Sequence, residues 1–254
     1  MTIRLISAAL VAGFLAACVA SGLQFALTSP LILEAEKYEN HAGLTAPEPG
    51  PASLIVLAHA EHGAGHAPAG TAPDAGASEW QPAPGLPRLA FTALATLVSG
   101  VGYALVLGAV LLATGRTITR GEALRFAIGG FLAASLAPAV GLPPELPGMG
   151  GEALELRQAW WVATALATAA GLYLIAIRGG AVAAAAGLAL IVAPHAWGAP
   201  HVAESGALPA AVAAQFAARS LAVAFVFWTV LGLSFGWAWD AVARERTGRG
   251  RVAA

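Results

Sequence analysis

Long apolar runs without a charged residue dominate the chain. Asp, Glu, Lys and Arg are absent from residues 5–33, 89–115, 126–144, 158–177, 179–203 and 220–239. A bilayer-spanning helix needs about 20 mostly apolar residues, and lipid offers no partner for free backbone groups, so each run predicts a membrane-spanning helix. The strand-like alternation of a membrane β-barrel is absent. We therefore predict one integral membrane domain over residues 1–254, an all-α polytopic helix bundle with spans at about residues 4–27, 90–113, 123–141, 158–177, 180–195 and 210–239.

Two of these runs leave the number and the course of the spans open. The fifth span is short, and only Arg178, Gly179 and Gly180 separate it from the fourth. Residues 158–195 could instead form one bent or re-entrant element, which would give five spans. The last run is too long for one untilted span and contains Arg219, so we expect its first part to lie on the membrane surface, with entry at about residue 220.

The composition supports a membrane protein and excludes several other classes. Apolar residues make up 58% of the chain and charged residues 11%, and the mean hydropathy is +0.72. A soluble domain averages about 25% charged residues, so this chain has too few charges to cover a water-facing surface. The net charge of −1 lacks the basic excess of a nucleic-acid binder, and so much apolar material excludes a disordered chain.

If six spans and a cytoplasmic N-terminus are assumed, most basic residues fall on the cytoplasmic side of the membrane and most acidic residues on the external side. Cytoplasmic positions then carry nine basic residues and external positions four, as expected because basic residues are retained inside. Eleven of the 14 acidic residues and all six histidines fall outside. We therefore expect both termini to be cytoplasmic, and the acidic, imidazole-bearing outer surface to concentrate cations.

The first span has a second interpretation. Residues 15–18, Leu-Ala-Ala-Cys, follow a short N-terminus with Arg4 and resemble a bacterial lipoprotein signal cleaved before Cys18. Apolar sequence continues to Leu27, whereas the apolar region of a signal has about 7–15 residues, which favours an uncleaved span. Cys18 is the only cysteine, so a disulfide within the chain and a cysteine-based zinc site are both excluded.

Residues 28–87 form a predicted external loop, rich in Pro, Gly and Ala, that we expect to be largely irregular. Its centre holds His59, His62 and His66 together with Glu61. Neutral imidazole is a common ligand for cobalt, nickel, copper and zinc, and carboxylate is a harder ligand. The tract therefore predicts a metal-binding segment, and the alternative is a solvated polar linker with incidental histidines.

The second outer loop places a carboxylate in a stiff, proline-rich turn. Glu145 follows Pro143 and Pro144, and prolines fix φ and stop helix extension. Such a carboxylate near the outer mouth could coordinate or attract an ion, or it could be an exposed residue of a helix-ending turn. Arg157 opens the next span and has two candidate carboxylate partners, Glu145 and Glu155.

Aromatic residues and histidines mark the same predicted membrane edge. Trp160 and Trp161 suit the aromatic belt at a membrane interface. In the third outer loop, His195 and His201 are flanked by prolines. We expect His195 to contact a transported ion, with a buried histidine bonded to backbone carbonyls as the alternative, and His201 to be more solvated.

Small residues within the spans predict close helix packing, because they let backbones approach. The candidates are Gly100, Gly102, Gly108, Gly232 and Gly236. Catalytic patterns are missing: the only lysine, Lys37, is not part of a phosphate-binding loop, and no nucleophile–base pair is evident. We therefore predict that the protein is not an enzyme.

The outer-loop motifs resemble those of the CbtA family, bacterial membrane proteins proposed to be cobalt transporter subunits. The resemblance covers nearly the whole chain and is most specific in the proline–glutamate loop at 141–148 and in Arg-Gln-Ala-Trp-Trp at 157–161. The other matching motifs are Gln24 with residues 29–32, residues 35–39, 59–66, Trp80, residues 100–105 and 136–138, and Pro194, His195, Gly198, Ala199 and Pro200.

The resemblance implies a cobalt uptake permease of the bacterial inner membrane, associated with corrinoid biosynthesis. It implies no tightly bound cofactor, Co²⁺ or another divalent transition metal as the cargo, and a small single-span partner subunit, CbtB. The alternative is a membrane metal sensor or assembly protein that binds metal without transporting it. In either case we predict metal ligands at His59, His62, His66, Glu145, His195 and His201, with further site residues at Pro144, Arg157, Trp160, Trp161, Gly198 and Pro200.

Overall fold

The computed structural model describes residues 1–45, 82–83, 85–147, 149, 154–200 and 208–252, and every regular element in them is helical. The α-helices are α1 (Thr2–Leu23), α2 (Ser29–Thr45), α3 (Leu86–Ala113), α4 (Arg120–Phe131), α5 (Ala137–Gly141), α6 (Leu154–Tyr173), α7 (Ala181–Trp197) and α8 (Ala210–Val252). Three π-helical turns continue α1, α4 and α6, namely η1 (Gln24–Thr28), η2 (Leu132–Leu136) and η3 (Leu174–Arg178). The prediction of an all-α polytopic bundle is confirmed.

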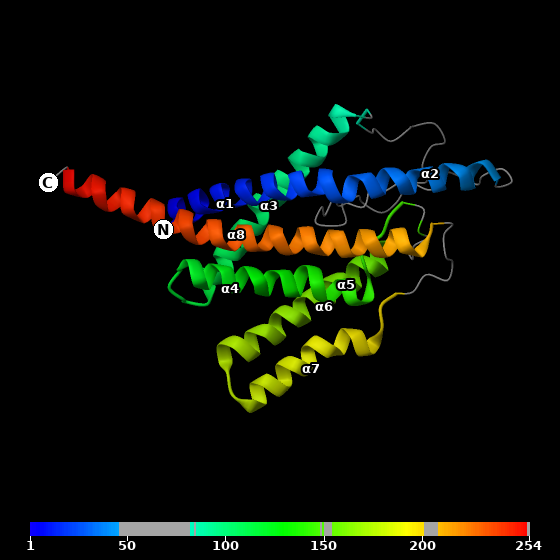
Figure 1. The fold of residues 1–254 in the computed structure, drawn as a ribbon. Helices are drawn as coiled ribbons and strands as arrows, with labels where there is room; N and C mark the ends of the chain where they lie inside the picture. Colours follow the sequence, from blue (N-terminus) through cyan, green and yellow to red (C-terminus); the bar gives the residue numbers. More distant parts are fainter. Residues whose placement is uncertain (46–81, 84, 148, 150–153, 201–207, 253–254) are drawn as a thin grey trace, which may run out of the picture.

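Six apolar passes run through the bundle. Among the described residues, five helices are long and apolar enough to cross a membrane, Thr2–Tyr38, Leu86–Ala113, Arg120–Gly141, Leu154–Arg178 and Ala210–Arg244. The remaining pass, α7, which is the fifth in chain order, is a shorter apolar helix. Its 17 residues extend about 25 Å at 1.5 Å per residue. Figure 1 shows that successive passes alternate in direction and that both termini lie at one end. The opposite end, where α2, α5 and α7 finish, is called the loop end below.

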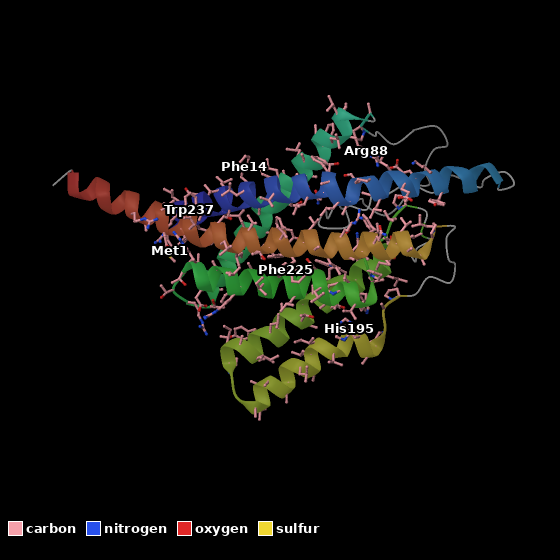
Figure 2. The ribbon with its side chains drawn as sticks, viewed as in Figure 1. Met1, Phe14, Arg88, His195, Phe225 and Trp237 are labelled. Carbon is pink, nitrogen blue, oxygen red and sulfur yellow. The ribbon has the colours of Figure 1, made fainter. Side chains whose placement is uncertain are left out.

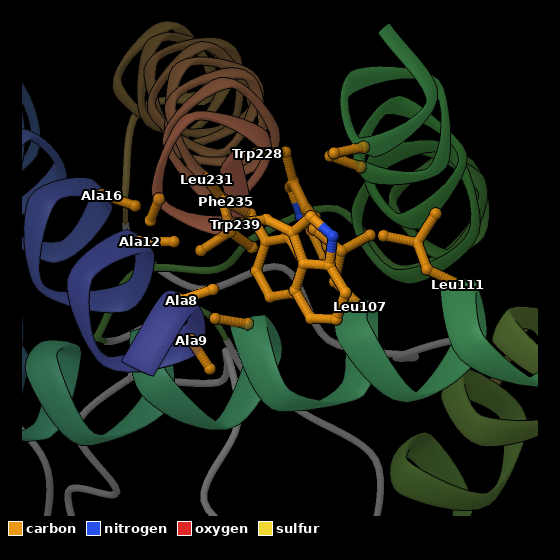
Figure 3. Close-up of a cluster of buried hydrophobic side chains, with 14 of the residues drawn as sticks. Ala8, Ala9, Ala12, Ala16, Leu107, Leu111, Trp228, Leu231, Phe235 and Trp239 are labelled. Atoms are coloured by element: carbon orange, nitrogen blue, oxygen red, sulfur yellow. The ribbon is translucent and has the colours of Figure 1, made fainter. Parts of the chain in front are cut away.

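The core lies between α1, α3, α4 and α8. On α1, Ala8, Ala9, Ala12 and Ala16 are fully buried, and Figure 3 shows them beside the large side chains of α8. Those side chains are Trp228, Leu231, Phe235 and Trp239, each no more than 6% exposed. Small residues on one helix therefore leave space for large residues on its neighbour, the arrangement that packs helices tightly in lipid.

Most of the glycines predicted to permit close packing do so. A Cβ at Gly100 would lie 2.7 Å from the Gly13 carbonyl oxygen, and one at Gly236 would lie 2.5 Å from the Arg120 Cα. At Gly108 and Gly232, neighbouring side chains and backbone likewise occupy the space that a Cβ would need. The prediction for Gly102 is wrong, because nothing lies within 4 Å of the position of its Cβ.

The fourth and fifth passes are two separate antiparallel helices, not one bent element. Gly179 and Gly180 both have positive φ, 67° and 87°, a conformation that glycine adopts without steric cost, so the chain reverses there. Between α6 and α7, Gly171 and Gly187 face each other, and a Cβ at Gly171 would lie 2.5 Å from the Gly187 carbonyl oxygen. Among the described helices, this α6–α7 hairpin contacts only the third pass, made of α4, η2 and α5.

The chain remains helical in two places where an irregular or surface segment was expected. Residues 29–45 of the predicted external loop form α2, because Leu31 and Ala35 pack against Phe216 of α8 and are almost fully buried. The expectation that the last pass begins as a separate segment on the membrane surface is not supported, because no break separates residues 210–219 from the rest of the helix. The entry point at about Ser220 stays a prediction. Helix α8 is continuous from Ala210 and lies along α1 and α2 (Figure 1).

Packing at Gly171 should be essential for the α6–α7 hairpin. We expect Gly171→Ala to lower the stability by about 1–3 kcal/mol, the usual cost of overpacking. The measurement is the melting temperature in detergent, followed by tryptophan fluorescence. Gly102→Ala is the matched control, because its methyl group would meet open space and alanine is the better helix former. Equal melting temperatures for the two variants would contradict the close approach of α6 and α7.

Candidate functional site

The proline-rich loop after α5 is anchored from the opposite side of the bundle. Leu146 is 3% exposed and packs with Leu31 and Ala35 of α2 and Phe216 of α8. Its backbone N–H donates to the Met149 sulfur, 3.3 Å away. Because the neighbouring prolines fix φ, burial of Leu146 sets the position of Glu145 at the loop end.

Glu145 forms an ion pair with Arg157 at the start of α6. The Arg157 Nη2 lies 2.6 Å from Glu145 Oε2, and the two side chains are 25% and 16% exposed. This distance confirms Glu145 as the partner, whereas Glu155, the other candidate, is exposed. Burial raises the pKa of Glu145 above its ordinary value, and the charge and hydrogen bond of Arg157 oppose that rise without cancelling it. Arg157 thus stabilises a carboxylate that burial would otherwise tend to neutralise.

One turn further along α6, Trp160 contacts His195 of α7. The ring centroids are 5.8 Å apart and the planes are inclined at 71°, an edge-to-face contact. Trp160 is 9% exposed, and the missing side chain of Gly141 makes room for it, since a Cβ there would lie 2.5 Å from Trp160 Cη2. Trp161 is half-buried. The two tryptophans are therefore packed against protein more than a simple interfacial belt would require.

The end of α7 is shaped by glycine and proline. Pro194 lies inside the helix, and Gly198 ends it with φ of 98°. The Gly198 N–H donates to the Pro194 carbonyl oxygen, 3.1 Å away. Pro200 follows in irregular chain and, like Pro144 in the preceding outer loop, is half-buried. This positive φ explains why the motif has glycine at 198, because other side chains rarely adopt it.

The structure brings two of the predicted metal ligands to the same stretch of α6. Glu145 contacts Arg157 and His195 contacts Trp160, and these positions lie one helical turn apart. The other four predicted ligands, His59, His62, His66 and His201, lie outside the described residues. Within the described residues, no three His, Cys, Asp or Glu side chains gather closely enough to hold a metal ion. The described part of the site therefore consists of one carboxylate and one imidazole, each in contact with a residue of the first turns of α6.

A second ion pair at the loop end was not foreseen from the sequence. Arg88 Nη2, at the start of α3, lies 2.6 Å from Glu36 Oε1 on α2, and Figure 2 labels Arg88 where α3 begins. Arg219 of α8 donates to the Leu27 carbonyl oxygen in η1, 3.0 Å away. The signal in the sequence was the placement of single arginines beside long apolar runs, where an unpaired charge is costly.

The Arg157–Glu145 pair should be energetically coupled. We expect Arg157→Gln and Glu145→Gln each to lower stability by about 1–3 kcal/mol, less than for a fully buried pair because both groups retain some solvent. The double variant should lose less than the sum of the two. Arg157→Gln should also raise the pKa of Glu145 further, because it removes the group that lowers it.

A double-mutant cycle of melting temperatures in detergent measures this coupling. The matched control is the pair of Glu122 and Arg125, 2.7 Å apart and one turn apart on α4, in which the arginine side chain is 77% exposed; we expect a coupling of about 0.5 kcal/mol or less there. Additive effects at Glu145 and Arg157 would mean that the ion pair does not stabilise the loop end.

Comparison with known proteins identifies the family. The family model described as "Probable cobalt transporter subunit (CbtA)" matches residues 2–240, which include every element of the site. No curated protein matches the chain, and no solved structure does. The match over nearly the whole length places the chain in the CbtA family of probable cobalt transporter subunits.

Proposed function

We propose that this chain is the membrane-embedded subunit of a cobalt uptake system in the bacterial inner membrane, supplying Co²⁺ for corrinoid biosynthesis. The family match supports transport and the metal. The single structural observation that carries the proposal is the placement of Glu145 and His195 against adjacent turns of α6. Imidazole nitrogen and carboxylate oxygen are both suitable ligands for a divalent transition metal.

Entry of the ion begins with an exchange of partners at Glu145. In the ion pair, the guanidinium group of Arg157 balances the negative charge of the Glu145 carboxylate. An arriving Co²⁺ carries twice that charge and can replace the guanidinium, while His195 supplies a nitrogen ligand from α7. Because Arg157 remains beside the site, it also repels the bound ion and favours its release. A site of moderate affinity suits a transporter, since an ion that binds too tightly does not leave.

The external histidines gather the ion before it reaches Glu145. In this proposal His59, His62 and His66 capture Co²⁺ from outside, and His201 lies on its way to the mouth. The excess of acidic residues in the predicted outer segments attracts cations to the same side. Both termini lie at the end opposite the loop end (Figure 1), which supports a cytoplasmic N-terminus and C-terminus together with an external mouth.

A second subunit completes the system. The family description names a subunit, and we propose that its partner is a small single-span protein of the CbtB type. Many large apolar side chains on the α6–α7 hairpin face away from the bundle, including Val182, Leu166 and Leu188, which are 85%, 66% and 59% exposed. This surface contacts lipid or a partner helix. No bond-making chemistry is needed, so the protein acts as a transporter and not as an enzyme.

The alternative function is a membrane metal sensor or an assembly protein. It would use the same histidines and Glu145 to bind the ion, but no ion would cross the membrane. The two ion pairs that fasten the loop end are compatible with either function. The discriminating property is therefore net passage of Co²⁺, because binding alone is common to both.

Uptake should depend on Glu145 and His195. In cells that express the chain with its partner, we expect Glu145→Gln and His195→Gln to lower radioactive Co²⁺ uptake by about tenfold or more, since each removes one ligand. Glu155→Gln is the matched control, because Glu155 is an exposed glutamate in the first turn of α6, two residues before Arg157. Wild-type uptake in both ligand variants would remove these residues from the mechanism.

A further inference from the structure

One face of α6 carries a line of buried polar atoms without hydrogen-bond partners. In the part of the chain that the structure describes, these atoms are Arg157 Nε, Trp160 Nε1, Thr164 Oγ1 and Thr168 Oγ1. Their spacing of three, four and four residues places them on one side of the helix. Thr168 lies about 16 Å along the axis from Arg157, at 1.5 Å per residue. The line therefore begins at the Glu145 ion pair and runs into the membrane-spanning part of α6.

The two threonines differ from four other threonines within the passes. Thr28, Thr92, Thr96 and Thr229 each donate to the carbonyl oxygen four residues earlier, at 3.0, 3.0, 2.9 and 2.8 Å. Such internal bonds satisfy a hydroxyl without any outside partner. Thr164 and Thr168 are 0% and 3% exposed and make no such bond in the structure. Because buried polar groups are nearly always satisfied, these hydroxyls point to a ligand that comes and goes.

The elements that pack on α6 contain prolines at positions that interrupt helical hydrogen bonding. On one side lie η2 and α5, and on the other lies α7. Pro138 in α5 is fully buried, and Pro194 lies inside α7. Each proline lacks an N–H and so leaves a carbonyl of the preceding turn without its helical donor. Irregular backbone of this kind is tolerated in a membrane where it is buried in protein or lines a hydrated path.

We propose that this face of α6 lines the path of a partly hydrated divalent cation from the Glu145–His195 mouth into the membrane, with Thr164 and Thr168 as its hydroxyl ligands. The assignment rests on the proposed function of that mouth. Hydroxyl groups are neutral and can donate to water as well as coordinate a cation through oxygen. They therefore suit an ion that moves with part of its water shell, whereas a ring of carboxylates would hold it.

Thiol accessibility tests the path without requiring transport. Thr164→Cys and Thr168→Cys are made in a Cys18→Ala background, which removes the only native cysteine, and are expressed with the partner in sealed vesicles. A positively charged methanethiosulfonate reagent, added from outside, reacts only where water reaches the thiol. We expect labelling at both positions and slower labelling in the presence of Co²⁺.

Leu166→Cys is the matched control, because it lies between the two threonines on the same helix and its side chain is 66% exposed toward the outside of the bundle. A thiol there faces lipid and should stay unlabelled. Absence of labelling at both Thr164→Cys and Thr168→Cys, or labelling that Co²⁺ does not slow, would overturn the proposal. If the wild-type chain moves no cobalt, the proposed function fails, yet this labelling result still decides the path.

Isosteric substitutions provide the second measurement, in case a cysteine variant fails to fold. Thr164→Val and Thr168→Val keep the volume and remove the hydroxyl, and we expect each to lower Co²⁺ uptake by about tenfold. Thr164→Ser and Thr168→Ser keep the hydroxyl and should retain most of the uptake. Thr229→Val controls for loss of an internally bonded threonine. Uptake at the wild-type rate in both α6 valine variants would overturn the proposal.

Discussion

The ion pair between Arg157 and Glu145 is the contact on which the loop end of the bundle depends. It joins α6 to a loop that Leu146 fastens to α2 and α8 on the far side. The α6–α7 hairpin otherwise contacts only the third pass among the described helices. The loop therefore connects the hairpin to the rest of the bundle, and the same carboxylate that makes this connection is the proposed metal ligand. Binding of a cation at Glu145 would alter the contact that positions the hairpin.

Two of the three π turns lie beside a proline on passes that run toward the loop end, whereas the third, η3, ends α6 at the opposite end. The π turns η1 and η2 are each followed, after one residue, by a proline, Pro30 and Pro138, and α7 contains Pro194. All three prolines lie on passes that run from the termini toward the loop end (Figure 1). Lipid cannot satisfy the carbonyl groups that such breaks release. In η1, Arg219 donates to the Leu27 carbonyl oxygen. This bond gives the half-buried guanidinium an acceptor and gives a carbonyl group in the irregular part of the helix a donor.

Much of the fold could be predicted from the sequence because lipid imposes a strict rule on charge and backbone. The second and third passes, expected at about 90–113 and 123–141, are Leu86–Ala113 and Arg120–Gly141. The errors occur where tertiary packing extends a helix: α2 and the first turns of α8 remain helical because Leu31, Ala35 and Phe216 bury one another. Such contacts join residues far apart in sequence and leave no local pattern.

The candidate site was less predictable, and for similar reasons. The Glu145–Arg157 pair could be proposed because both residues flank one short loop, but Arg88 and Glu36 are 52 positions apart. Thr92 and Thr164 look alike in the sequence, yet one donates to its own helix and the other does not. That difference depends on what surrounds each hydroxyl. The predicted roles of His59, His62, His66 and His201 stay predictions, because these residues lie outside the described part of the chain.

Net passage of Co²⁺ tests the central claim most directly. The chain and the proposed small single-span partner are reconstituted into sealed vesicles that contain a dye quenched by Co²⁺, and the metal is added outside. The account predicts that the dye is quenched in vesicles with both proteins and stays bright in protein-free vesicles. Binding of Co²⁺ to the protein while the dye stays bright, with the partner present, would contradict it.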